Sequence, residues 1–174
     1  MTIYIKNMVC KCCVVVVRQE FEKLGLKPKV GLGDVRLSRN LLKAEQVTIS
    51  QRLKKLGLVL LIDEKEQLVQ KIKSLLVKKI ESENVEAHFG LANYLSSKLG
   101  KEYSQITRLF SAMEGMTIEQ FFIARKIEKA KALLHHEIPL KEIARKLGYS
   151  NISHLSAQFK KVTGFTPSAF KKES

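Results

Sequence analysis

A 12-residue pattern occurs twice in the second half of the chain. It reads FSAMEGMTIEQF at residues 110–121 and FKKVTGFTPSAF at residues 159–170. Both copies contain a Phe, four residues, a Gly, an apolar residue, a Thr, three residues and a second Phe. Gly commonly follows the last residue of a helix, and Thr commonly caps the start of the next one. The repeat therefore predicts two modules, each of which ends one helix and begins another.

The residues before each copy extend the pattern into a helix-turn-helix. They read LSSKLGKEYSQITRLF at 95–110 and IARKLGYSNISHLSAQF at 143–159. In each stretch a small residue precedes a Gly by four positions: Ser96 with Gly100, and Ala144 with Gly148. The small side chain allows a close helix crossing, and the Gly allows a turn with positive φ. We expect two helix-turn-helix modules, at about 90–115 and 139–164; a helical repeat that binds no nucleic acid is the alternative.

The repeated pattern also predicts how each module ends. In the second copy, Gly164 should end the recognition helix, Thr166 should cap the next helix, and Phe170 should fold back onto the core. In the first copy, Thr117 and Gln120 have the spacing of a capping box.

A helix at 121–134 is expected to hold the two modules apart. Its sequence, FFIARKIEKAKALL, places on one face Ile123, Ile127, Ala130 and Leu134. His135 and His136 follow it, and we interpret them as partners of the helix C-terminus rather than metal ligands.

The segments RKIEKAKALL (125–134) and IARKLGYSNISHLSAQFKKVTGFTPSAF (143–170) resemble the AraC/XylS family of bacterial transcription regulators. The similarity covers about residues 64–174. It implies two recognition helices in successive major-groove segments on one face of the duplex. The first module departs from the family pattern, with Gly90 and Glu102 in place of the usual Ser or Thr caps and Ser96 in place of Ala.

Candidate DNA-binding residues follow from the helical period of 100° per residue. On the first recognition helix, opposite the expected core residues Ile106, Leu109 and Phe110, lie Ser104, Arg108 and Ser111, with Thr107 at the edge. Arg108 can donate two hydrogen bonds to one guanine. On the second helix, the expected core face is Ile152, Leu155 and Phe159. Opposite that face or at the helix ends lie Asn151, Ser153, His154, Ala157, Lys160 and Lys161. Of these, Ser153 and Ala157 suit base edges, Asn151 and the two lysines suit phosphates, and His154 suits either a phosphate or a packed position.

Residues 1–63 carry mixed strand and helix patterns. Alternation and apolar runs predict the order β-α-β-β-α-β, with strands in 2–9, 27–32, 34–38 and 58–63 and helices at 14–24 and 44–56. This is the order of a ferredoxin-like fold. An amphipathic helix within 64–82 should connect this domain to the remainder, 83–174. The expected fold class is thus an α+β ferredoxin-like domain followed by an all-α double helix-turn-helix domain.

The chain has three cysteines, all within MVCKCC (8–13). Met8, Cys10 and Cys13 form a Met-x-Cys-x-x-Cys motif, whose thiolates could hold Cu(I) or another soft metal ion on a loop. This motif, the element order and LKKLGLVLL (53–61) resemble the heavy-metal-associated domain of copper chaperones, although Cys12 is additional. Packing cysteines in a sensing or dimerising module are the alternative, and we expect no other cofactor.

The formal net charge is +14, which predicts an anionic partner. Residues 1–80 contain 17 Lys and Arg against 7 Asp and Glu, and residues 81–174 contain 14 against 10. Charge alone therefore does not identify the half that meets the anion. The start of the sequence lacks the apolar region of a signal peptide, and no apolar run is long enough to span a bilayer.

We therefore expect a cytoplasmic, non-enzymatic transcription regulator that binds double-stranded DNA and no membrane. RNA polymerase and a second copy of the chain are further candidate partners. The alternative function is a soft-metal carrier or metal-responsive protein that acts through Cys10 and Cys13.

Overall fold

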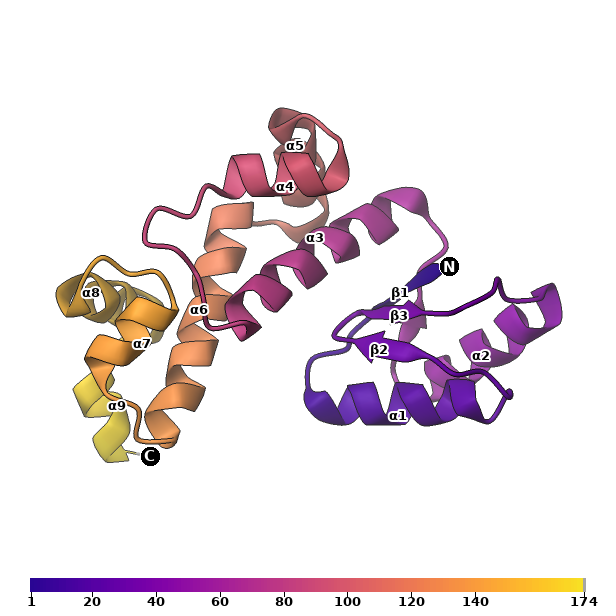
Figure 1. Ribbon diagram of the computed structural model, residues 1–174, viewed down its shortest axis with the longest axis horizontal. Helices are drawn as coiled ribbons and strands as arrows, with labels where there is room; N and C mark the ends of the chain where they lie inside the picture. Colours follow the sequence, from indigo (N-terminus) through magenta and orange to yellow (C-terminus); the bar gives the residue numbers. More distant parts are fainter. Residues whose placement is uncertain (174) are drawn as a thin grey trace. The chain divides into compact units, whose positions relative to one another are not determined.

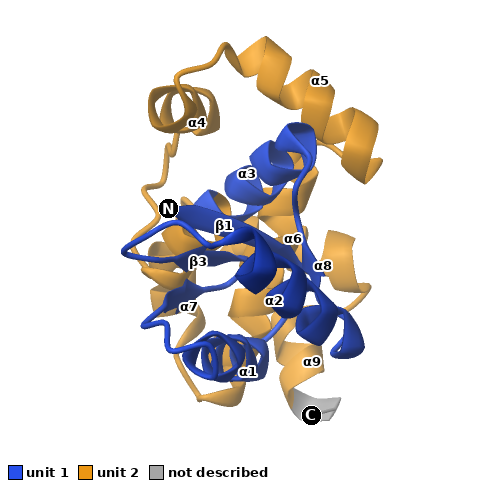
Figure 2. Cartoon of the chain, turned by 90° about the vertical axis from the view of Figure 1, so that its right-hand side faces the viewer, with its two compact units in different colours: residues 1–75 blue, residues 76–174 orange. Residues whose placement is uncertain are grey.

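The chain folds into two compact units, residues 1–75 and 76–174 (Figure 2). The computed structural model describes residues 1–173. The division falls inside helix α3 (Glu64–Glu81), the helix that the sequence places between the two domains. None of the described helices combines the length and the apolar character needed to cross a membrane.

The first unit contains a four-stranded antiparallel sheet in the order β2-β3-β1-β4, and Figure 1 labels its strands β1, β2 and β3. The strands are β1 (Thr2–Lys6), β2 (Lys29–Gly31), β3 (Asp34–Arg36) and β4 (Val59–Leu60). Helix α1 (Lys11–Glu22) follows β1, and α2 (Lys43–Lys55) lies between β3 and β4. The observed order of elements is β-α-β-β-α-β, as expected.

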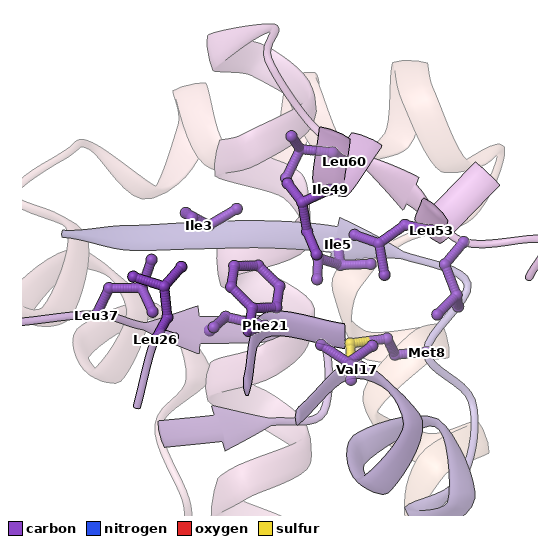
Figure 3. Close-up of a cluster of buried hydrophobic side chains, with 12 residues drawn as sticks. Ile3, Ile5, Met8, Val17, Phe21, Leu26, Leu37, Ile49, Leu53 and Leu60 are labelled. Carbon is purple, nitrogen blue, oxygen red and sulfur yellow. The ribbon is translucent and has the colours of Figure 1, made fainter. Parts of the chain in front are cut away.

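A hydrophobic core lies between one face of this sheet and the two helices (Figure 3). Phe21 of α1 and Ile49 and Leu53 of α2 are fully buried there, together with Ile5 of β1. The short alternation of β1 explains this arrangement, because Ile3 and Ile5 point to the same side of the strand.

Two sequence expectations for this unit need correction. Helix α1 begins at Lys11, so Cys12 and Cys13 belong to its first turn and not to a loop. Strand β4 is only two residues long, and Val59 is 46% exposed. Successive side chains of a strand point to opposite faces, so Val59 points away from the core that buries Leu58 and Leu60.

The hairpin between β2 and β3 packs against the first half of α3. The Ser74 hydroxyl donates a hydrogen bond to the Leu32 carbonyl at 3.0 Å. A Cβ on Gly33, where φ is +86°, would lie 2.0 Å from the Gln70 side-chain nitrogen. Gly is therefore required here both by the turn and by the close approach of α3.

The described part of the second unit is helical. After α3 it contains α4 (Leu91–Leu99), α5 (Tyr103–Glu114), α6 (Ile118–His135), α7 (Leu140–Lys146), α8 (Ile152–Thr163) and α9 (Pro167–Glu173) (Figure 1). Helices α4 and α5 form the first expected helix-turn-helix, and α7 and α8 form the second.

Candidate nucleic-acid interface

The turns of both modules have the backbone geometry that the sequence predicts. Gly100 lies between α4 and α5 with φ +62°, and its N–H donates to the Ser96 carbonyl at 2.8 Å. Gly148 lies between α7 and α8 with φ +67°. The small residue of the second module, Ala144, is 3% exposed, so the two helices meet closely at that position.

The two copies of the repeated pattern make the same ring contact. Phe110 packs edge-on against Phe121 with ring centroids 5.7 Å apart. Phe159 packs edge-on against Phe170 at 5.6 Å. In each copy the first Phe lies on the recognition helix and the second lies on the next helix. The repeat thus fixes each recognition helix to the helix that follows it, and the expected return of Phe170 to the core is confirmed.

The helix ends of the repeat are also confirmed. Gly115 and Gly164 end α5 and α8 in the left-handed conformation. The Thr117 hydroxyl accepts from the Gln120 N–H at 3.1 Å, and the Gln120 side chain accepts from the Thr117 N–H at 2.8 Å, which completes the capping box. The Ala169 N–H donates to the Thr166 hydroxyl at 3.2 Å, so Thr166 caps α9.

Helix α6 contacts α5, α7, α8 and α9, and so holds both recognition helices. Its buried face differs from the expected one. Ile127, Ala130 and Leu134 are buried, but Ile123 is only half-buried. The buried residues of α6 are Ile118, Phe122, Lys126, Ile127, Ala130, Leu133 and Leu134. The apolar face is rotated because Phe122 is buried in place of its neighbour Ile123, and helical periodicity cannot choose between adjacent residues of similar hydropathy.

A lysine is buried between α6 and the second module. Lys126 is 8% exposed, and its Nζ lies 3.7 Å from the centroid of the Tyr149 ring. Such a contact partly compensates an ammonium for lost hydration. Burial lowers the pKa of Lys126 to about 8 and raises the pKa of Tyr149. This pair was not expected from the sequence, because a Lys within a charged helix is normally solvated.

On α5, the four residues expected to face DNA differ in how exposed their side chains are. Ser104 and Arg108 are exposed, whereas Thr107 and Ser111 are half-buried. The Thr107 hydroxyl donates to backbone carbonyls of α5, including that of Tyr103 at 3.1 Å. Arg108 has no hydrogen-bond or ion-pair partner within the described part of the chain, so its guanidinium is available to a ligand.

The orientation of α5 is fixed at its first residue. The Tyr103 hydroxyl donates to the Glu119 carboxylate of α6 at 2.5 Å. This hydrogen bond lowers the pKa of Glu119, and burial with the same contact raises the pKa of Tyr103. Gln105 and Ala112 are also exposed on α5, although helical periodicity did not identify them as candidate DNA-binding residues.

On α8, Ser153, Ala157, Lys160 and Lys161 are exposed, as expected. Asn151 has a structural role that the sequence analysis did not assign. Its side-chain oxygen accepts from the His154 N–H at 2.8 Å, which makes Asn151 the cap of the helix.

His154 and Ile152 also depart from simple expectation. The His154 ring packs edge-on against Tyr149 at 5.2 Å, and its Nδ1 lies 3.2 Å from the Ser150 hydroxyl. His154 is nevertheless exposed. Ile152, which we expected on the core face, is 41% exposed. It is the first residue of α8, where the helix has not yet entered the core.

Glu83, which follows α3, forms ion pairs with two lysines of the second unit. Glu83 accepts from Lys146 of α7 at 2.8 Å and pairs with Lys129 of α6 at 3.1 Å. These two contacts, with Lys146 contributing most, lower the pKa of Glu83. The neighbouring Val85 is buried, and its N–H donates to the Lys146 carbonyl at 3.1 Å. Glu83 and Val85, which lie between α3 and α4, are therefore packed against the second module.

The cysteine motif is only partly assembled. The sulfurs of Cys10 and Cys13 lie 3.4 Å apart. Met8 is 8% exposed and belongs to the hydrophobic core of the first unit, beside Val17 (Figure 3). Within residues 1–173, no group of three or more His, Cys, Asp or Glu side chains is arranged to hold a metal ion.

Known proteins are similar to part of this chain. Residues 95–173 match the family model described as helix-turn-helix domain. The chain is 26% identical over 114 residues to the probable transcriptional regulator LumQ of Photobacterium leiognathi, covering 65% of this chain and 45% of LumQ. It thus spans less than half the length of that relative.

Solved structures show the same fold. The C-terminal domain of AraT, a response regulator from Geobacillus stearothermophilus, matches with a TM-score of 0.57 and 20% identity over 64% of this chain and 89% of that one. A transcriptional regulator from Chromobacterium violaceum, of the proteins that contain an AraC-type DNA-binding domain, matches with a TM-score of 0.51 and 19% identity, over 60% and 92%.

Two helix-turn-helix modules joined by one long helix define a double helix-turn-helix domain. The matching family model identifies residues 95–173 as a helix-turn-helix domain, and the solved structures share its fold.

Proposed function

We propose that the protein is a sequence-specific transcription regulator that reads two successive major-groove segments of double-stranded DNA. The observation that carries this proposal is the pair of recognition helices, α5 and α8, which are both held by α6 and both present exposed polar and basic residues. A helix of this kind fits the major groove, where each base pair has a distinct pattern of donors and acceptors.

On α5, Arg108 is assigned to a guanine, because its free guanidinium can donate two hydrogen bonds to one base. Ser104 lies on the same exposed face and contributes single hydrogen bonds. Thr107 and Ser111 flank this face, and Thr107 retains acceptor capacity although its proton is used within the helix.

On α8, Ser153 and Ala157 are assigned to base edges, Ala157 through a thymine methyl group. Lys160, Lys161 and the amide of Asn151 are assigned to phosphates. His154 is assigned to a phosphate as well, since its ring is held by Tyr149 at the start of the helix.

For the first unit we propose a ferredoxin-like sensing or dimerising domain. Its support is the element order together with the antiparallel strand order β2-β3-β1-β4. On this account the whole chain acts without enzymatic chemistry in the cytoplasm, with RNA polymerase and a second copy of the chain as its protein partners.

Soft-metal binding through Cys10 and Cys13 is the second candidate function. The 3.4 Å separation of the sulfurs favours it, because two thiolates are suitable ligands for Cu(I). The buried Met8 does not supply a third ligand in this arrangement. Loss of anaerobic Cu(I) binding in Cys10→Ser and Cys13→Ser, with retention in Cys12→Ser, is the result this candidate predicts.

Selection of bound fragments from a genomic library tests the main proposal. We expect the purified chain to enrich a common sequence, and the affinity for that sequence to fall steeply as salt rises, because phosphate contacts release counterions. Enrichment of no sequence, with equal binding to all fragments, would refute sequence-specific regulation.

A further inference from the structure

Two thiols of the first unit stand close together at the start of α1. Cys10 is the N-cap residue, with extended backbone dihedrals and no side-chain capping hydrogen bond. Cys13 lies three residues later, in the first turn of the helix. Side chains three positions apart share a helix face, and the two sulfurs are 3.4 Å apart. A disulfide requires them to approach by about 1.4 Å more, to the bonded distance of about 2.05 Å.

The surroundings allow this movement. Cys10 is exposed, and its side chain can rotate without breaking a capping contact. Cys13 is half-buried and packs against the hydrophobic core, so it provides the fixed sulfur. Cys12 is also exposed, but adjacent residues on a helix point about 100° apart. The geometry therefore selects Cys13 rather than Cys12 as the partner of Cys10.

The other end of the same loop is already restrained. Asn7 has a positive φ of 71°, and its side-chain amide donates to the Gly57 carbonyl at 3.0 Å. A bond between Cys10 and Cys13 would restrain the loop at its second end and attach it to the core through Cys13. Oxidation would thus change the mobility of the segment between β1 and α1.

We propose that Cys10 and Cys13 form a reversible redox site, which closes to an intramolecular disulfide by exchange with a low-molecular-weight disulfide. The Cys10 thiolate attacks one sulfur of the reagent, whose S–S bond breaks and releases one thiolate. The Cys13 thiol then loses its proton and attacks the Cys10 sulfur of the mixed disulfide, which releases the second thiolate. The reagent takes up two electrons and, with the two protons, leaves as two thiols.

This inference is independent of DNA binding, and its test uses the full chain without DNA. The reduced protein is incubated in glutathione buffers of increasing oxidised fraction, with a chelator present to exclude metal ions. Free thiols are then blocked with iodoacetamide, and the products are mapped by peptide mass spectrometry. We expect Cys12 alone to be alkylated in the oxidised protein, and all three cysteines after re-reduction.

Variants locate the bond and serve as matched controls. Cys12→Ser should still lose two reactive thiols on oxidation, whereas Cys10→Ser and Cys13→Ser should not form an intramolecular bond. Circular dichroism checks that each variant is folded, and the peptide map of the unaltered chain does not depend on any variant. A bond that includes Cys12, a stable glutathione adduct on Cys10 that never closes, or disulfides only between chains would each overturn the proposal.

Discussion

Replacing Gly148 by Ala should be far more damaging than the same change at the equivalent turn of the first module. Gly148 has φ +67° and Gly100 has φ +62°, so the backbone strain on adding a Cβ is similar at the two sites. That strain is about 1–2 kcal/mol. The surroundings differ: a Cβ at Gly148 would lie 2.6 Å from the Glu86 carbonyl oxygen and 2.8 Å from that of Val85, whereas at Gly100 nothing lies within 4 Å.

The carbonyls at 85 and 86 belong to backbone that is held in place, because the Val85 N–H bonds to Lys146 and Glu83 pairs with two lysines. Forcing a methyl group into such a contact costs about 1–3 kcal/mol more. We therefore expect a free-energy loss of about 2–5 kcal/mol for Gly148→Ala and about 1–2 kcal/mol for Gly100→Ala.

Urea unfolding followed by tyrosine fluorescence measures this difference. The chain contains four Tyr and no Trp, and Tyr94, Tyr103 and Tyr149 all lie in the second unit, so the signal reports mainly on that unit. Equal destabilisation by the two substitutions would refute the packing of residues 83–86 against the turn. DNA affinity should follow the same order, because the turn sets the position of α8.

Three further predictions concern single side chains. Arg108→Ala should cost about 1–3 kcal/mol at one operator base pair and relax preference there; a uniform loss on all sequences in a binding-site panel would identify a phosphate contact instead. Lys161→Ala should weaken binding on all sequences and reduce the slope of log affinity against log salt by about 0.9; an unchanged slope would remove Lys161 from the interface. Lys126 has a folded-state pKa of about 8, below its ordinary value of 10.5. Between pH 8 and 10.5 the unfolded chain therefore binds this proton more strongly than the folded chain, and the free energy of unfolding should rise with pH. Unfolding of Lys126→Met should lack this rise, and identical pH profiles would contradict the burial of the ammonium.

Local patterns in the sequence predicted the turns and the caps, because each depends on residues close together in the chain. Gly100, Gly148 and Gly164 have the expected positive φ, and the capping box at Thr117 is formed. These features need only backbone sterics and one or two short hydrogen bonds, which a few adjacent residues determine.

Contacts between distant segments were not predictable in this way. Glu83 meets Lys146 across 63 positions, and Lys126 reaches the Tyr149 ring from another helix. Periodicity reports which face of a helix is apolar, but it does not identify the neighbouring element or its exact rotation. For the same reason the expectation that Ile123 and Ile152 are buried was wrong. The sequence analysis also did not predict that the Asn151 side chain caps its own helix.

The direct test of the central claim is a hydroxyl-radical footprint of the full chain on a selected operator. If α5 and α8 occupy successive major-groove segments, the footprint should contain two protected regions on one face of the duplex, about one helical turn of 10–10.5 base pairs apart. Substitutions on α5 such as Arg108→Ala should weaken one region selectively, and substitutions on α8 such as Ser153→Ala should weaken the other. A single protected region, or two regions on opposite faces of the duplex, would contradict the account.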